Sequence, residues 1–562
     1  MVERMLESKA IGAMPIVNRV IRRLGIEEEI DKAVDAVLTP RGRKAAVPHG
    51  RVLCVVIRNL VTSRLPLYRF QDWVAGFVPE QLGLTPDESL LFHDDRVGKS
   101  LDWFYKVDRG TLVTRVVVDM AKRFNLDLSQ FHSDTTSLTF FGEYLTAAPG
   151  CQSPFIITLG RNKDHRDDLK QLVFSLCVSR DGAVPVHHQV FDGNTTDDNI
   201  HIGIWNTLRS IVGHPNFTYV ADCKLDNETS LRHIAGNGGT FVTVMPANHM
   251  EYSRFEEWIQ SHEPPWEELI RRPDSRREDG PPQVFRGYED PLLSSGGFRI
   301  IWIHSSDKAR LDRESREGKI ERAARALDAL RPRLGRRGLK TEKKIREAVD
   351  EILKVGGVGR WLAVEVRVID KPSYKQTGPG RPGKDTEYRR EMKHEFELSW
   401  RTRPDTVQWD SRMDGIFPLE ANSKSASPKE ILEIYKFQPY LEKRNEQLKN
   451  VLNVVPMWLK SPERIASFLT LMFLALLVSC LIEREIRNAM RDEELSSLPI
   501  YPEERECQSP TTEKVLQLFD GIRRSRLFED GTLVDSFWDA LTPVQREVLR
   551  LLRVPRNEYG AG

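Results

Sequence analysis

Cysteine is scarce in this sequence, and its spacing argues against two common roles. Six Cys are spread over 562 residues, without a Cys-x2-Cys motif or a zinc-ligand spacing. The pattern argues against a disulfide framework and against a structural zinc site. We therefore expect reduced thiols in a cytoplasmic protein.

An excess of charge of one sign is missing too. The 83 Lys and Arg residues are balanced by 82 Asp and Glu residues, so the formal net charge is +1. Net charge therefore says nothing about nucleic acid, and any basic surface must be local. The composition, 40% hydrophobic and 29% charged, is typical of a soluble globular protein.

Only one long hydrophobic run is present, at residues 465–482, where 18 residues carry no charge. A membrane-spanning helix needs about 20 mainly apolar residues. Pro462 and Glu463 precede the run, as is typical of the start of a soluble helix. We predict a buried core helix and no membrane anchor. Charged residues interrupt the apolar patch at the N-terminus, so we expect no signal peptide.

The pattern of apolar residues divides the chain into five segments, in line with domains of roughly 100–200 residues. We predict a helical N-terminal domain (1–125), the first part of an α/β core (126–249), an insertion domain (250–420), the second part of the core (421–490) and a C-terminal helical region (491–562). Two interpretations of the N-terminal domain stay open. It binds DNA ends through its scattered basic residues, or it is a helical packing domain with solvated charges.

The first part of the core alternates between strand and helix patterns. Predicted strands lie at 131–143, 171–179, 183–191, 217–221 and 241–245, and predicted helices at 199–212 and 227–234. Asp181-Gly182 between two strands is a strong hairpin signal. Three antiparallel strands followed by two strands reached through helices predict an RNase H-like mixed five-stranded sheet. The fold class is therefore α/β, interrupted by a mainly β insertion.

The insertion contains predicted strands at 298–304, 361–368, 395–401 and 415–420, and two predicted helices at 309–330 and 341–354. Between the helices lies a joint, residues 331–340, with five basic residues and no acidic one. We expect this joint to contact DNA phosphates.

Two aspartates stand out in the predicted sheet. Asp134 lies inside the first strand, and Asp222 ends an otherwise apolar one. The first and fourth strands are neighbours in such a sheet, so the two carboxylates would lie side by side and repel. A divalent cation removes the conflict, and oxygen ligands suit Mg²⁺. Taken singly, each aspartate is better explained as a cap or turn residue, and the pair on adjacent strands favours the metal-ligand interpretation.

After the insertion, Ser427 and Pro428 begin a helix that reaches about residue 449, with a kink or restart at Pro439. Four polar residues lie on one face of this helix: Tyr435, Gln438, Glu442 and Lys449. A solvent-exposed polar face without any function would show the same spacing.

These segments together resemble the DDE transposases of bacterial insertion sequences, in the cut-and-paste group marked by Tyr-x2-Arg-x3-Glu-x6-Lys. Tyr435-x2-Gln438-x3-Glu442-x6-Lys449 reproduces every spacing. The strands around Asp134 and Asp222 also resemble those of the family. The resemblance covers residues 125–250 and 412–490, and family members carry a largely β insertion between the second Asp and the Glu.

The resemblance implies that Asp134, Asp222 and Glu442 are the catalytic residues and hold two Mg²⁺ ions, for which Mn²⁺ substitutes. The implied reaction is in-line phosphoryl transfer at transposon ends, through a DNA hairpin and then into target DNA. The implied partners are terminal inverted repeats and target DNA, bound by a homodimer in the nucleoid. We expect nine residues to bind DNA: Tyr435, Gln438, Lys449, Lys436, Arg331, Arg333, Arg336, Arg337 and Lys340.

Two further features are candidates for DNA contacts. An extruded base stacks on an aromatic side chain in such reactions, and Trp302, Trp361, Trp400 and Trp409 lie in or beside the insertion. A place in the hydrophobic core is the simpler explanation of each. Residues 380–383, Gly-Arg-Pro-Gly, resemble a minor-groove hook or a plain flexible loop.

Gln438 is a departure from the signature, because it stands where the family has Arg. Glutamine keeps a hydrogen bond but loses the charge and the bidentate fork of arginine. Two alternatives stay open beside a transposase. One is a nuclease of the same fold that does not join DNA, and the other is a catalytically inactive DNA-binding repressor.

Overall fold

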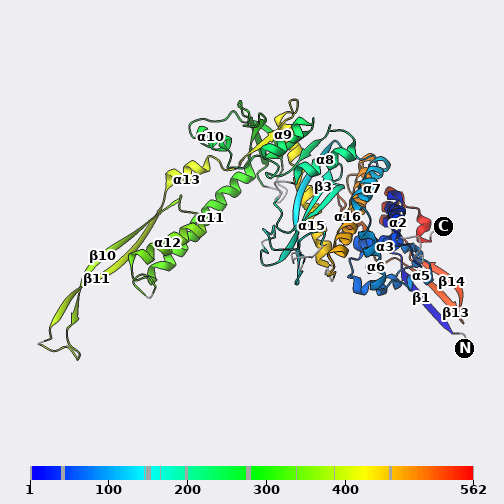
Figure 1. The fold of residues 1–562 in the computed structure, drawn as a ribbon, viewed down its shortest axis with the longest axis horizontal. Coiled ribbons are helices and arrows are strands. Elements are labelled where there is room, and N and C mark those ends of the chain that lie inside the picture. Colours follow the sequence, from blue (N-terminus) through cyan, green and yellow to red (C-terminus); the bar gives the residue numbers. More distant parts are fainter. Residues whose placement is uncertain are drawn as a thin grey trace. The chain divides into compact units, whose positions relative to one another are not determined.

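The computed structural model describes residues 3–38, 45–144, 146, 153–164, 166–196, 200–273, 280–336, 338–384, 386–454 and 459–560. The chain forms two compact units. The first contains Met1–Thr243 and Glu433–Gly562, and the second contains Val244–Leu432. Figure 1 shows the elements of both units in chain order.

Helices dominate the N-terminal part of the first unit, as the sequence predicts. They are α1 (Met14–Leu24), α2 (Ile26–Val37), α3 (His49–Thr62), α4 (Phe70–Ala75), α5 (Pro86–Ser89), α6 (Asp94–Tyr105) and α7 (Arg109–Arg123). One strand, β1 (Arg4–Ala10), precedes them and was not predicted.

The strands and helices that follow occur in the predicted order. They are β2 (Gln130–Phe140), β3 (Lys170–Ser179), β4 (Pro185–Phe191), α8 (His201–Val212), β5 (Thr218–Val220), α9 (Glu228–Gly236) and β6 (Thr240–Val244). Their spatial order is β4-β3-β2-β5-β6. β2, β3 and β4 pair antiparallel, and β5 pairs parallel with both β2 and β6. The sheet is therefore mixed and the fold is α/β.

The turn between β3 and β4 needs a glycine for two reasons. Gly182 has a φ of +77°, which disfavours other residues. A Cβ there would also lie 3.0 Å from the side chain of Arg484. Arg484 in turn contacts Asp181 at 2.8 Å, so the predicted hairpin turn is clamped from outside.

The helix that follows the insertion restarts close to Pro439, as predicted. α14 (Pro428–Tyr435) and α15 (Gln438–Val454) are separate helices. Ser427 caps α14 reciprocally, because its Oγ accepts from the Glu430 N–H while its own N–H donates to the Glu430 carboxylate at 2.7 Å.

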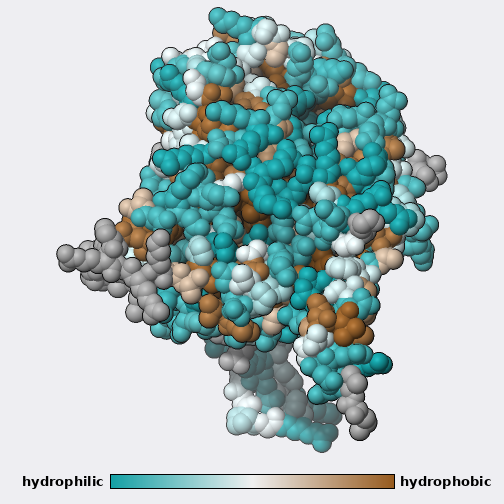
Figure 2. Space-filling view, turned by 90° about the vertical axis from the view of Figure 1, so that its right-hand side faces the viewer, coloured by the Kyte–Doolittle hydropathy of each residue, from teal (hydrophilic) through white to brown (hydrophobic). Residues whose placement is uncertain are grey.

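The apolar run lies in α16 (Pro462–Asp492), a helix long and apolar enough to cross a membrane by length and composition alone. In the fold, 94% of its most apolar window is buried. α16 contacts α1, α3, α6, α15 and β4. The face drawn in Figure 2 is mostly hydrophilic, with hydrophobic residues in separate patches. These observations agree with the predicted buried core helix.

The C-terminal region is not wholly helical, and here the prediction is wrong. After α17 (Thr512–Gln517) come two strands, β13 (Arg523–Glu529) and β14 (Thr532–Trp538), before α18 (Pro543–Leu551). β13 pairs antiparallel with both β1 and β14. A strand at the opposite end of the chain supplies the backbone hydrogen bonds of β13, and local sequence spacing cannot report such a partner.

The second unit contains comparable lengths of helix and strand, so the predicted mainly β composition is also wrong. Its strands are β7 (Glu267–Arg272), β8 (Gln283–Glu289), β9 (Arg299–Ser305), β10 (Leu362–Gln376), β11 (Tyr388–Thr402) and β12 (Ile416–Ala421). Its helices are α10 (Met250–Trp258), α11 (Ser306–Leu330), α12 (Glu342–Gly356) and α13 (Pro404–Ser411). Four strands lie in the order β12-β9-β8-β7, and β10 pairs with β11 as a separate two-stranded ribbon.

Arg444 fixes α15 within the first unit. Its guanidinium donates to the carbonyls of Gly182 and Ala183 in the β3–β4 turn, at 2.9 and 3.2 Å. It also contacts Glu483 of α16 at 2.8 Å, and both side chains of this pair are about 95% buried. One side chain thus joins α15, α16 and the sheet.

We expect Arg444→Met to lower the free energy of unfolding by about 3 kcal/mol, because removing one partner of a buried ion pair leaves the other poorly compensated. Among the described residues, the salt-bridge partner left to Glu483 would be Arg487, at 2.9 Å. Guanidinium titration followed by fluorescence measures the loss. The exposed neighbour Lys443 is the control, and Lys443→Met should change stability by less than about 0.5 kcal/mol. Equal effects of both substitutions would contradict this account of α15.

Candidate active site

The strand register brings Asp134 and Asp222 to the same level. β2 pairs with β5 in parallel, with His132 opposite Val220. Two residues further along both strands stand Asp134 and Asp222, where β5 has just ended. The two predicted ligands therefore come from neighbouring strands at one height of the sheet.

Hydrogen bonds hold the loop after β5 in place. The Oγ1 of Thr243 donates to the backbone carbonyl of Asp222 at 2.8 Å. The backbone N–H of Lys224 donates to the Asp222 carboxylate at 3.1 Å. Asp222 is thus positioned by the end of β6 and by its own turn.

The electrostatics of the pair show a conflict. Burial raises the pKa of Asp134, the ammonium of Lys163 acts against that rise, and the charge of Asp222 adds to it. The net shift is upward despite a salt bridge in which Lys163 Nζ lies 3.1 Å from Asp134 Oδ1. The surroundings of Asp134 therefore disfavour its negative charge.

α15 joins this pair through a residue that the sequence analysis did not single out. Asn445 Nδ2 donates to Asp134 Oδ2 at 3.1 Å. Glu442 lies one turn earlier on the same helix and is exposed. The third predicted ligand thus stands on the helix that contacts the first.

Tyr435 links Glu442 with Asp222. Burial raises the pKa of the Tyr435 phenol to about 12, and the charges of Asp222 and Glu442 contribute to the rise. The negative charges of both carboxylates therefore favour the protonated form of one phenol.

Gln438 serves the packing of α15 on β2. Its Oε1 can only accept, so His132 donates to it from Nδ1, at 2.7 Å. The Nε2 of His132 then accepts from Gln130 at 2.7 Å. Burial lowers the pKa of His132 to about 4, in keeping with this neutral tautomer. The amide oxygen of Gln438 is thus committed to the protein interior.

Lys449 lies close to the same group of residues. Its Nζ contacts Asp164 at 2.5 Å, and Asp164 follows Lys163 in the loop between β2 and β3. Lys163 itself is anchored, since its Nζ also donates to the carbonyl of Thr135 at 2.7 Å. The loop therefore connects Asp134 with the last residue of the helix signature.

Comparisons with known proteins add little to this geometry. A family model described as a domain of unknown function, DUF4277, matches residues 6–118, which are the N-terminal helices. No curated protein sequence matches the chain significantly. Among solved structures, the chain is similar to a piggyBac transposase synaptic complex with hairpin DNA, at 10% identity and a TM-score of 0.26, over 80% of this chain and 85% of that chain. A TM-score this low does not establish a common fold.

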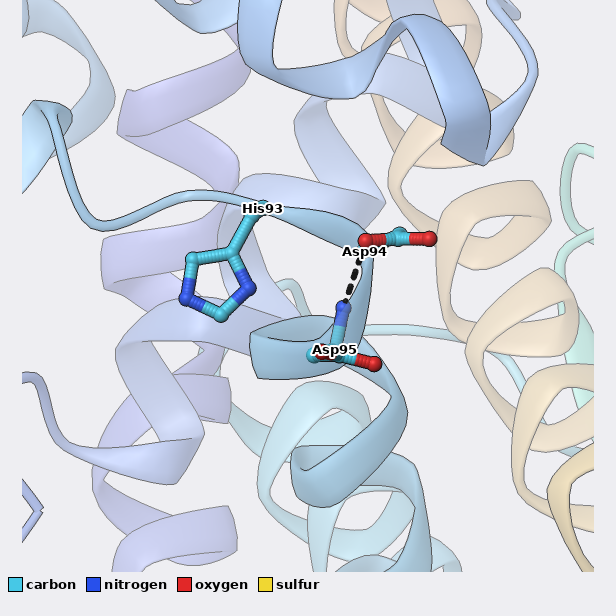
Figure 3. Close-up of side chains that lie close together, drawn as sticks. All are labelled: His93, Asp94 and Asp95. Atoms are coloured by element: carbon cyan, nitrogen blue, oxygen red, sulfur yellow. Dashed lines mark hydrogen bonds between the residues drawn. The ribbon is translucent and has the colours of Figure 1, made fainter.

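A different set of ligand atoms lies closer together than the predicted triad. The ligand atoms of His93, Asp94 and Asp95 are all within 4.8 Å of one another, at exposed positions (Figure 3). These residues are consecutive and begin α6, where negative charge stabilises the helix dipole. The backbone N–H of Asp95 also donates to Asp94 at 2.9 Å. We attribute the cluster to the start of the helix.

The basic joint of the insertion is in part a packing element. Arg331 stacks over the ring of Trp400 at 4.2 Å and donates to the carbonyl of Leu398 at 3.0 Å, so it ties α11 to β11. Three other predicted DNA contacts of the joint are exposed: Arg333, Arg336 and Lys340. Arg337 lies outside the described residues. Lys436, between α14 and α15, is half-buried.

The four tryptophans in or beside the insertion differ in exposure, and two of them, Trp361 and Trp400, are half-buried. Trp302 is fully buried and stacks on Phe255 at 3.8 Å, which makes it a core residue. Trp361 donates its ring N–H to Asp410 at 2.6 Å. Trp409 is 38% exposed. Burial thus removes Trp302 from the candidates for base stacking.

We expect Asp134→Asn to raise the thermal stability of the metal-free protein near neutral pH. Because the pKa of Asp134 is raised in the folded state, the folded protein binds this proton more tightly than the unfolded chain does. That contribution is complete below the ordinary value of 3.8 and is lost as pH rises through the raised pKa. Calorimetry from about pH 3 to about pH 8 should show a difference in Tm that grows with pH.

The exposed residue Glu446, also on α15, provides the control, and Glu446→Gln should leave Tm unchanged at every pH. A lower Tm for Asp134→Asn at neutral pH would contradict the prediction, because the contacts with Lys163 and Asn445 would then outweigh the cost of burying the charge.

Proposed function

We propose that this chain is a DNA transposase that cuts transposon ends and joins them to target DNA by in-line phosphoryl transfer. The observation that carries the proposal is the register of β2 and β5, which sets Asp134 and Asp222 side by side, while Asn445 brings the helix of Glu442 onto Asp134. The strand order β4-β3-β2-β5-β6 supports an RNase H-like core, the fold that the resemblance to DDE transposases implies.

The donor set suits Mg²⁺. Carboxylate oxygens are the ligands that this ion prefers, and it binds through few protein groups with waters completing the shell. The charge of Asp222 contributes to the raised pKa of Asp134, and the ammonium of Lys163 already contacts the Asp134 carboxylate, so a cation at this place would relieve the repulsion between the two carboxylates. Each carboxylate repels the others, so a bound cation would draw the three closer together.

Asp134, Asp222 and Glu442 would hold the ions. When bound, two Mg²⁺ ions supply Lewis-acid stabilisation of the attacking and leaving oxygens. Tyr435, protonated because its pKa is raised to about 12, would donate its O–H to a phosphate oxygen of the DNA end. Lys449 would exchange its Asp164 partner for a DNA phosphate. The protein thus orients the scissile phosphate and supplies no nucleophile of its own.

The remaining features of the proposed reaction are those that the resemblance to DDE transposases implies. We propose a hairpin intermediate at each DNA end, a homodimer that processes two ends together, and action in the cytoplasm on nucleoid DNA. Gln438 keeps its structural bond to His132, so the loss of the arginine charge at this position weakens a phosphate contact without removing α15 from the sheet.

The direct test uses purified full-length protein, Mg²⁺ and a labelled duplex with the inverted repeat that flanks the coding sequence. Wild type should nick the repeat end and join it to a second duplex. Glu442→Gln should abolish both steps while leaving binding of the duplex intact, because it removes one negative ligand from an exposed position. Glu446→Gln, with the same change of charge on α15, should retain activity.

Three results would each overturn the proposal. Cleavage without joining indicates a nuclease of the same fold. Binding without cleavage, unchanged in Glu442→Ala, indicates a repressor. Activity in EDTA would rule out metal-dependent transfer.

Tyr435→Phe should lower the rate of cleavage roughly tenfold, the effect of losing one hydrogen bond to a charged group. Because the pKa of Tyr435 is about 12, wild type and variant should give parallel pH–rate profiles up to about pH 10. A profile in which only the wild type changes with pH would show that the phenol acts as a base, contrary to the proposed role as donor.

A further inference from the structure

The outer half of the β10–β11 ribbon is a basic surface without a core. Figure 1 shows the two strands running on past α12. The inner half packs on α11 and α12 through Val366 and Leu398. Residues 371–393 form the outer half and are exposed almost throughout, with seven basic and three acidic residues. A two-stranded hairpin is marginally stable alone, so an outer half of this length is suited to binding a partner.

Like charges face each other across the two strands. Lys371 lies opposite Lys393, and Lys375 lies opposite Arg389. All four are on one face, because their positions alternate by two along each strand. Like charges directly opposite are destabilising. Lys371 has a partner in Glu395 at 2.6 Å, and the other three form no salt bridge with a described carboxylate. A polyanion along this face would supply the missing charge.

The opposite face of the outer half carries aromatic residues. Tyr374 lies opposite Arg390, and Tyr388 lies opposite Gln376. The two tyrosines are 65% and 51% exposed. Tyrosine and arginine both contact the sugar–phosphate backbone of DNA. This face therefore also suits a nucleic acid partner.

Two hydrogen bonds constrain the tip of the ribbon. Gly380 and Gly383 flank Arg381 and Pro382. The backbone N–H of Gly383 donates to Thr386 Oγ1 at 2.7 Å, and Gln376 Nε2 donates to the Gly380 carbonyl at 3.1 Å. The minor groove of DNA is about 6 Å wide and admits small residues, and an arginine is favoured where A·T pairs narrow it.

We propose that the outer half of this ribbon binds duplex DNA, with Arg381 in the minor groove of an A·T-rich segment and Lys375 and Arg389 on the flanking phosphates. The inference rests on the proposed function in that the partner is DNA. Beyond the proposed function, it specifies that the ribbon binds the minor groove, that the bound segment is rich in A·T pairs, and which residues make the contacts.

The test measures binding of full-length protein in EDTA to three labelled duplexes of equal length, built from A·T, G·C or inosine·C pairs. Inosine lacks the amino group that guanine places in the minor groove, while its major groove resembles that of G·C. Wild type should bind the A·T and inosine·C duplexes about tenfold more tightly than the G·C duplex.

Arg381→Ala should bind all three duplexes equally. The double substitution of Lys375→Ala and Arg389→Ala should weaken binding to all three alike and reduce the slope of log affinity against log salt by about 2. Arg367→Ala with Arg401→Ala is the matched control on the same face of the inner half, where Arg367 pairs with Glu365 at 2.8 Å. The control should bind as wild type does.

Equal affinity of wild type for the three duplexes, or tight binding to A·T but not to inosine·C, would overturn minor-groove reading. An Arg381→Ala variant that keeps the preference would overturn the role of the tip. A chain that cuts DNA with Mg²⁺ but shows no such preference would contradict this inference alone. A preference that depends on Arg381, in a chain that cuts nothing, would contradict the proposed transposition alone.

Discussion

The docking of α15 against β2 is the constraint on which the candidate site depends. Two consecutive residues carry it, because Arg444 is buried between the β3–β4 turn and Glu483, while Asn445 reaches Asp134. Glu442 is 220 residues beyond Asp222 in the sequence, and nothing local brings the two together. A buried ion pair contributes little net stability over an apolar pair, but it has a demanding geometry. The rotation of α15 about its axis, and hence the side on which Glu442 stands, follows from that geometry.

The site that this docking creates is in electrostatic conflict. Asp134 is held close to Asp222 in surroundings that raise its pKa, although Lys163 and Asn445 both contact it. A sheet selected only for stability would place an apolar residue in the middle of β2, as at Leu138. Departures from local rules of this kind concentrate at functional sites, where a ligand supplies the compensation. The polar contacts of Asp134 reduce the free-energy cost of burying its carboxylate but do not cancel that cost. A bound cation would reduce the cost further.

Much of the core could be predicted because its signals are local. The pattern of apolar residues and the Asp181-Gly182 turn predicted the order of the strands, and Pro439 predicted the restart of the helix. The role of Asn445 could have been predicted from the sequence, since this residue follows Glu442 by one helical turn. The contact of Lys163 with Asp134 could not have been predicted, because the conformation of the loop that carries Lys163 is not encoded in a local sequence pattern. The strands β13 and β14 were mistaken for helix because β13 depends on pairing with β1, more than 500 residues away. Strand formation in such segments is decided by the partner.

The near-zero net charge hides two surfaces of opposite sign, each in a different compact unit. The acidic triad lies in the first unit, and the basic outer half of the ribbon lies in the second. The proposed reaction on DNA would need both, because carboxylates that hold cations repel the phosphate backbone. Basic residues must therefore supply the attraction, and they must stand apart from the carboxylates so that the two sets do not simply neutralise each other. The balance of 83 basic and 82 acidic residues in the whole chain therefore carries no evidence against a nucleic acid partner.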